Sequence, residues 1–179
     1  DFKDCGPTCL RIISKYYGKD IPLQQIRNLS ETTREGSSLL GLSNAAENLG
    51  LKSLGIKTDF QTFAEEIPLP CIVHWNKVHF VVVYKIDKLG KIYVSDPSYG
   101  LITYEKEEFI KFWIGENANE TTEEGVALLL ETTPAFYQNE FDETNSKTSF
   151  SFLSRYLLKY KSLVFQLSVG LLAGSLLSL

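Results

Sequence analysis

The sequence predicts an α+β fold, in which helices come first and an antiparallel sheet follows. In the first third of the chain, apolar residues recur three and four positions apart, which is typical of amphipathic helices. From Cys71 onward the pattern changes to short runs of β-branched and aromatic residues separated by turn sequences. Because helices and strands are segregated along the chain, the strands are expected to pair antiparallel.

Helix boundaries follow from residues that start or stop helices. Pro7 suits the first turn of a helix, Ser37 or Ser38 can cap the next long one, and Gly18 and Gly50 stand where these helices would end. The predicted helical segments are residues 5–17, 23–29, 38–49, 59–66 and 106–113.

Strand boundaries follow from turn residues. Asn76-Lys77 and Leu89-Gly90 suit hairpin connections, and Asp96–Gly100 has the composition of a turn. The predicted strands are residues 51–57, 71–75, 78–86, 91–95, 101–104 and 126–130.

Cys5 is the first candidate for chemistry, because it lies at or just before a predicted helix N-terminus. The partial positive charge there favours a thiolate over a thiol. A cysteine nucleophile also needs a base, and the chain holds only two histidines, His74 and His79. His79 begins a strongly apolar strand, and Asp96 closes a later one. Together, Cys5, His79 and Asp96 predict the nucleophile, base and orienting group of a thiol protease. Taken singly, each is better explained as a structural residue: a buried cysteine, a core histidine and a turn aspartate.

Other roles for the cysteines and histidines stay open at this stage. Cys9 and Cys71 are expected to be buried core residues, and His74 is the second candidate for the base. A zinc site from Cys5, Cys9, His74 and His79 is conceivable, but the spacing matches no standard ligand pattern. Three cysteines are too few for a disulfide framework and indicate a reduced compartment.

The C-terminal segment differs from the rest of the chain. Residues 150–161 carry Arg155, Lys159 and Lys161 beside an apolar face, and Ser162–Leu179 holds no charge. This pattern predicts an interfacial helix that leads into the beginning of a membrane span, with the preceding body in the cytoplasm. A buried C-terminal helix of a soluble protein is the alternative. The acidic body argues against nucleic acid as a partner.

Four stretches, in this order, resemble motifs of the C39 peptidases, papain-like domains at the N-termini of bacterial bacteriocin-exporting ABC transporters. They are Asp4–Leu10 (DCGPTCL), the helix that begins with Ser38–Ser43 (SLLGLS), Pro70–Trp75 (PCIVHW) with His79–Val83 (HFVVV), and Asp96-Pro97. The resemblance implies a peptidase domain at residues 1–131, a linker at 132–149, and the start of a transporter membrane domain at 150–179.

The same resemblance implies residue roles: Cys5 as nucleophile, His79 as base and Asp96 as the orienting group. It also implies a substrate, a precursor peptide with a double-glycine leader that is removed before export across the bacterial cytoplasmic membrane. No cofactor is expected in this chain, which lacks a phosphate-binding loop. ATP and Mg²⁺ are expected to bind an ATPase domain further along the transporter, and the full transporter is expected to be a homodimer.

One departure from the family pattern concerns an oxyanion-hole glutamine six residues before the cysteine, a position that falls before Asp1. The chain begins with Asp and has no Met, so an excerpt or a processed product is expected, with impaired activity. Two other classes of protein stay open: a catalytically silent C39-like domain that only docks substrate, and a soluble papain-like hydrolase unrelated to transport.

Overall fold

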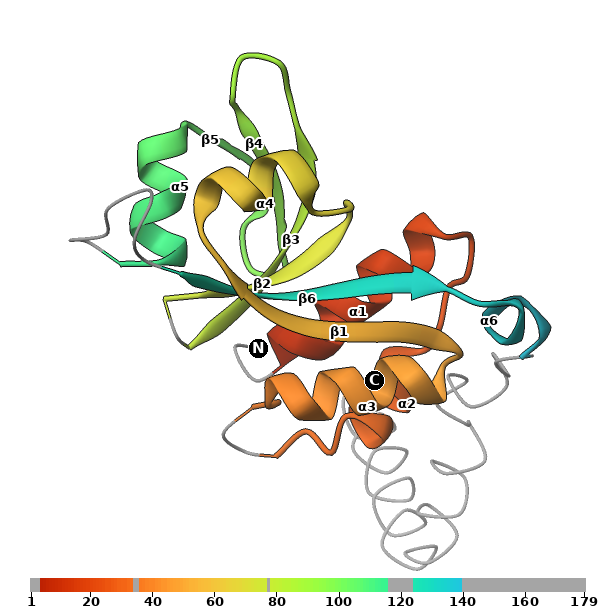
Figure 1. Cartoon of the computed structure of the whole chain (residues 1–179). Coiled ribbons are helices and arrows are strands. Elements are labelled where there is room, and N and C mark those ends of the chain that lie inside the picture. The colour runs from red at the N-terminus through yellow and green to blue at the C-terminus, as the bar shows by residue number, and fades with distance from the viewer. Residues whose placement is uncertain (1–3, 34–35, 77, 116–123, 140–179) are drawn as a thin grey trace, which may run out of the picture. The chain divides into compact units, whose positions relative to one another are not determined.

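The computed structural model describes residues 4–33, 36–76, 78–115 and 124–139, which belong to one compact unit, Asp1–Phe141 (Figure 1). The helices are α1 (Cys5–Tyr16), α2 (Leu23–Leu29), α3 (Leu39–Asn48), α4 (Phe60–Glu66), α5 (Lys106–Trp113) and α6 (Pro134–Gln138). The strands are β1 (Leu51–Thr58), β2 (Cys71–Trp75), β3 (His79–Ile86), β4 (Ile92–Asp96), β5 (Gly100–Tyr104) and β6 (Gly125–Thr132).

Within these described residues the strands form a single antiparallel sheet, which confirms the α+β prediction. The order is β1-β6-β2-β3-β4-β5, so the last strand of the unit inserts between β1 and β2. The hairpin of β2 and β3 pairs Cys71 with Val83 and Trp75 with His79. Both edges of β2 are therefore occupied, and its side chains are covered on both faces.

Each face of the sheet is covered by its own set of helices. One buried cluster joins α1, α2, α3 and α6 to alternate residues of the central strands, among them Ile72, Phe80 and Val82. The intervening residues, among them Val73, Val81 and Val83, pack with α4 and α5. In Figure 1 α2 and α3 lie below the long strands β1 and β6, α1 crosses behind these strands, and α4 and α5 lie above them. The strict alternation of a strand produces this division.

Side-chain caps explain where several helices begin. The Ser38 hydroxyl accepts a hydrogen bond from the Gly41 N–H at 3.0 Å, so Ser38 and not Ser37 caps α3. The Asp59 carboxylate likewise accepts from the Thr62 N–H at 3.0 Å at the start of α4.

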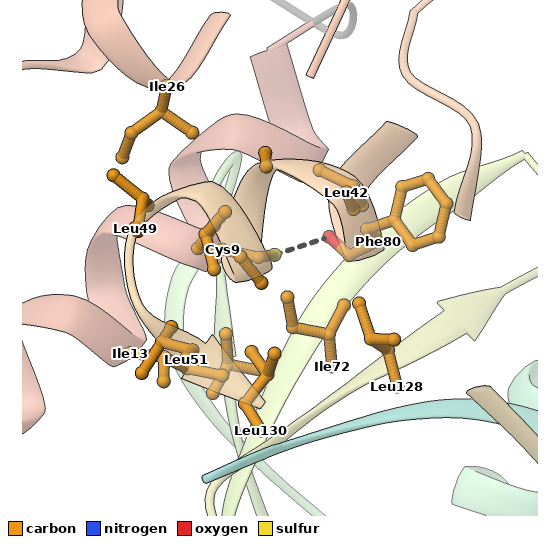
Figure 2. Close-up of a cluster of buried hydrophobic side chains, with 14 of the residues drawn as sticks. Cys9, Ile13, Ile26, Leu42, Leu49, Leu51, Ile72, Phe80, Leu128 and Leu130 are labelled. Carbon is orange, nitrogen blue, oxygen red and sulfur yellow. Dashed lines mark hydrogen bonds between the residues drawn. The ribbon is translucent and has the colours of Figure 1, made fainter. Parts of the chain in front are cut away.

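Helix α1 is attached to the sheet by apolar packing and by one specific polar contact. Leu10 and Ile13 are fully buried, and the Cys9 Sγ donates to the Phe80 carbonyl oxygen at 3.2 Å (Figure 2). The contact joins two segments 71 residues apart in the sequence. It therefore fixes α1 along the length of β3.

The other face of the sheet holds a cluster of aromatic side chains. Phe63 and Trp113 lie with ring centroids 4.5 Å apart, and Phe109 lies 5.8 Å from Phe63. The Trp113 Nε1–H donates to the Val126 carbonyl at 3.0 Å, and its ring lies directly over Gly125. Only a residue without Cβ fits beneath that ring.

The segment after β6 differs from the expected linker. Residues 134–138 form α6, whose Phe136 is fully buried in the cluster around α1, and the Thr133 hydroxyl donates to the Gly50 carbonyl at 2.6 Å. The remainder of the predicted linker and the predicted interfacial helix and membrane span, 150–179, lie outside the described residues, so the domain boundaries stay a prediction. Among the described residues, no helix combines the length and apolarity that crossing a bilayer requires.

The close contact between Gly125 and Trp113 generates a stability prediction. A Cβ at position 125 would lie 2.2 Å from the indole ring, so Gly125→Ala must displace a packed Trp and is expected to lower the free energy of unfolding by about 1–3 kcal/mol. Gly55→Ala is the matched control on β1, because its Cβ would meet only a Leu39 methyl group at 3.5 Å. Urea denaturation of both variants checks this, and equal midpoints would contradict it.

Candidate active site

Cys5 is the first residue of α1, and its side chain is buried with a relative accessibility of 5%. The following residue, Gly6, lies against the Leu42 side chain of α3, at a place where an added Cβ would come within 2.9 Å of Leu42. The start of α1 is thus packed closely onto α3. The N-terminal end of the helix and its partial positive charge are held at the position of the thiol.

His79 and Asp96 come from neighbouring strands. His79 begins β3, Asp96 ends β4, and antiparallel pairing brings these two strand ends to the same end of the sheet. The His79 Nε2 lies 3.1 Å from the Asp96 Oδ1, and both side chains are buried. The same Asp96 oxygen accepts from the backbone N–H groups of Ser98 at 2.7 Å and Tyr99 at 3.3 Å. The turn after β4 therefore orients the carboxylate toward the imidazole.

The structure also brings His79 to Cys5. Burial by itself lowers the pKa of His79, but hydrogen bonds with Cys5 and Asp96 and the negative charges near the ring outweigh it, so the pKa is raised. The imidazole thus interacts with both the thiol and the carboxylate, and these interactions stabilise its protonated form.

The other two cysteines are core residues, as predicted. Burial raises the pKa of the Cys9 thiol well above its ordinary value, with the charges of Cys5 and Asp96 adding to the effect, and the thiol donates to the Phe80 carbonyl. Burial alone raises the pKa of Cys71, which lies in β2. Both side chains are held as neutral thiols and are poor nucleophiles.

His74 takes a different place from His79. Its ring stacks on Phe80 with centroids 4.7 Å apart, and burial lowers its pKa. Across the part of the chain that the structure describes, no three His, Cys, Asp or Glu side chains come together as a metal site would require. The zinc alternative built on Cys5, Cys9, His74 and His79 therefore has no geometric support.

One ion pair at the site was not anticipated from the sequence. Arg27 of α2 forms a two-pronged contact with Asp4, the residue before Cys5, with Nε–Oδ1 and Nη2–Oδ2 distances of 2.7 and 2.5 Å. Nothing within a few residues of either side chain signals the pairing, because it depends on how α2 packs against α1.

The raised pKa of His79 leads to a prediction for Asp96→Asn. The asparagine removes the charge but retains a side-chain oxygen for Ser98 and Tyr99, so we expect the fold to persist and the pKa of His79 to fall. Protonated His79 stabilises the native protein at pH below about 6.5, and that contribution disappears as the pH rises through the raised native pKa. The variant is expected to lose the part of this pH dependence that comes from Asp96, whereas the part that comes from Cys5 remains.

Histidine NMR titration checks this prediction. The chain has two histidines, and His74, which stacks on Phe80, serves as an internal control whose midpoint should not move. An unchanged His79 midpoint in the variant would show that Asp96 does not set its protonation.

Three comparisons place the chain among known proteins. The model of the peptidase C39 family matches residues 1–123. The lactococcin-G-processing and transport ATP-binding protein LagD of Lactococcus lactis subsp. lactis is 35% identical over 168 residues, which cover 91% of this chain and 22% of LagD. The chain thus spans less than a quarter of the length of this curated relative.

Two solved structures are similar to this fold. A double-glycine-motif protease from an AMS/PCAT transporter, solved in complex with the leader peptide, superimposes with a TM-score of 0.63 and 32% identity, covering 72% of this chain and 84% of that one. The peptidase domain of Streptococcus ComA, a bifunctional ABC transporter involved in quorum sensing, superimposes with a TM-score of 0.63 and 30% identity, covering 74% and 94%. The family model matches well over half of this sequence, and the chain therefore belongs to the peptidase C39 family.

Proposed function

We propose that this chain is a cysteine endopeptidase that removes double-glycine leader peptides from bacteriocin-like precursors. The observation that carries the proposal is the convergence of Cys5, His79 and Asp96 in a member of the C39 family. A similar protease was solved with a leader peptide bound, and this likeness supports the substrate class.

The proposed reaction uses the three side chains in sequence. His79 takes the Cys5 proton, and Sγ attacks the carbonyl carbon of the scissile peptide bond. The C–N bond then breaks, the leaving amine takes the proton from His79, and a thioester remains on Cys5. Water attacks the thioester while His79 accepts its proton, which releases the leader carboxylate and restores the thiol. Asp96 orients the imidazole and stabilises its protonated form throughout.

The larger assembly is proposed from the resemblance. Residues 150–179 would form an interfacial helix and the beginning of the first membrane span of an ABC transporter. The peptidase domain would then face the cytoplasm, and a downstream domain would bind ATP and Mg²⁺ to drive export. Two relatives are named as transport and ATP-binding proteins, which supports this arrangement. We expect the full transporter to be a homodimer.

Cleavage of a synthetic precursor with a Gly-Gly leader tests the proposal. Cys5→Ala is expected to reduce the cleavage rate by several orders of magnitude, because it removes the group that attacks the carbonyl. Cys71→Ala, which changes a buried thiol on β2, is the matched control and should retain activity. Mass spectrometry of the products locates the cut. If the unaltered chain binds the precursor without cutting it, even with the upstream segment described next, the docking alternative is favoured instead.

A second prediction concerns the oxyanion hole. We propose that an upstream segment with a glutamine six residues before Cys5 completes the hole, and that adding it raises the rate on the order of a hundredfold. The same extension with Ala in place of Gln is the control. Equal rates for the extended and original chains would rule out the glutamine contribution.

A further inference from the structure

The contact between Arg27 and Asp4 has the geometry of a strong ion pair. Two nitrogens of the guanidinium meet the two carboxylate oxygens at 2.7 and 2.5 Å. The pair is partly shielded from solvent, with relative side-chain exposures of 34% and 17%. Two-pronged pairs of this kind add geometric specificity to the attraction between the charges.

The pair changes what Asp4 does at the start of α1. An Asp at the N-cap position ordinarily turns its carboxylate onto the first N–H groups of the helix. Here Asp4 is the N-cap residue but makes no side-chain cap, and the first turn of α1 contains no acidic residue. The carboxylate is held instead by α2. The positive end of the helix is therefore not neutralised by a side chain at the residue that carries the thiol.

Among the described residues, charged or titratable side chains near Cys5 come from several places in the fold. The sheet contributes His79 from β3 and Asp96 from β4, α2 contributes Arg27, and the N-cap position before α1 contributes Asp4. The neighbouring β2 histidine, His74, stacks on Phe80, and α3 presents the apolar Leu42. An uncompensated carboxylate on the adjacent residue would oppose a thiolate at Cys5. Arg27 supplies a positive charge to that carboxylate.

We propose that Arg27 is a positioning residue for the nucleophile. It holds the Asp4 carboxylate away from the first N–H groups of α1 and cancels its charge, so that the helix end and the protonated His79 act on the Cys5 sulfur. This inference rests on the proposed role of Cys5 as nucleophile.

The test measures how fast iodoacetamide alkylates Cys5 across a range of pH. In Arg27→Gln the Asp4 carboxylate loses its guanidinium partner, and the midpoint of the profile is expected to move up by about half to one pH unit, so that labelling below the midpoint slows roughly three- to tenfold. Arg27→Lys keeps the charge and should lie close to the unaltered chain. Peptide mapping assigns the label to Cys5, with Cys5→Ser as the blank.

A double variant separates this role from a merely structural one. Asp4→Asn combined with Arg27→Gln also lacks the ion pair but carries no negative charge beside Cys5. Electrostatic positioning predicts that the midpoint returns to that of the unaltered chain. If the double variant keeps the shifted midpoint of Arg27→Gln, or if Arg27→Gln shows no shift, the inference is overturned.

The same data distinguish this inference from the proposed function. A labelling midpoint exists for any thiol, so the differences among the variants test Arg27 whatever the reactivity of Cys5. Alkylation of the unaltered chain no faster than free cysteine at neutral pH would count against the nucleophile itself.

Discussion

The candidate site depends on how α1 is held against the sheet. Cys5 and Cys9 stand one helical turn apart on α1, and His79 and Phe80 are consecutive residues of β3. The hydrogen bond from Cys9 to the Phe80 carbonyl therefore ties the helix to the strand within a few residues of both candidate catalytic groups. Apolar packing alone would hold α1 on the sheet but would permit small shifts along it. A directional bond in a buried, low-dielectric place removes that freedom.

The remaining geometry follows from antiparallel pairing. The start of β3 and the end of β4 meet at one end of the sheet, and the turn beyond Asp96 supplies two N–H groups to its carboxylate. The insertion of β6 beside β2 makes the hairpin of β2 and β3 central, so His79 begins a strand whose neighbours are all in place. Rigid elements thus carry the imidazole and the carboxylate, which preserves their separation more reliably than loops would.

Most local structure was readable from the chain because its signals act over a few residues. Caps such as Ser38 and Asp59 and the runs of β-branched and aromatic residues from Cys71 onward predicted helices and strands within a residue or two of their observed ends. Helix α6 was missed because it is a single short turn in a polar segment. Only the burial of Phe136 against α1 and its neighbours reveals why that turn forms. Strand order has no local signal at all.

The order of residues along the chain was enough to predict which chemical groups are present and the elements on which they lie: a cysteine at a helix start, two histidines near a hairpin, and an aspartate at a strand end. Which of these groups come into contact depends on how distant segments pack. The tertiary structure places His79 between Cys5 and Asp96, stacks His74 on Phe80, and pairs Arg27 with Asp4. The reason is physical: propensities and caps are set by neighbours in the chain, whereas these meetings depend on packing between segments distant in sequence.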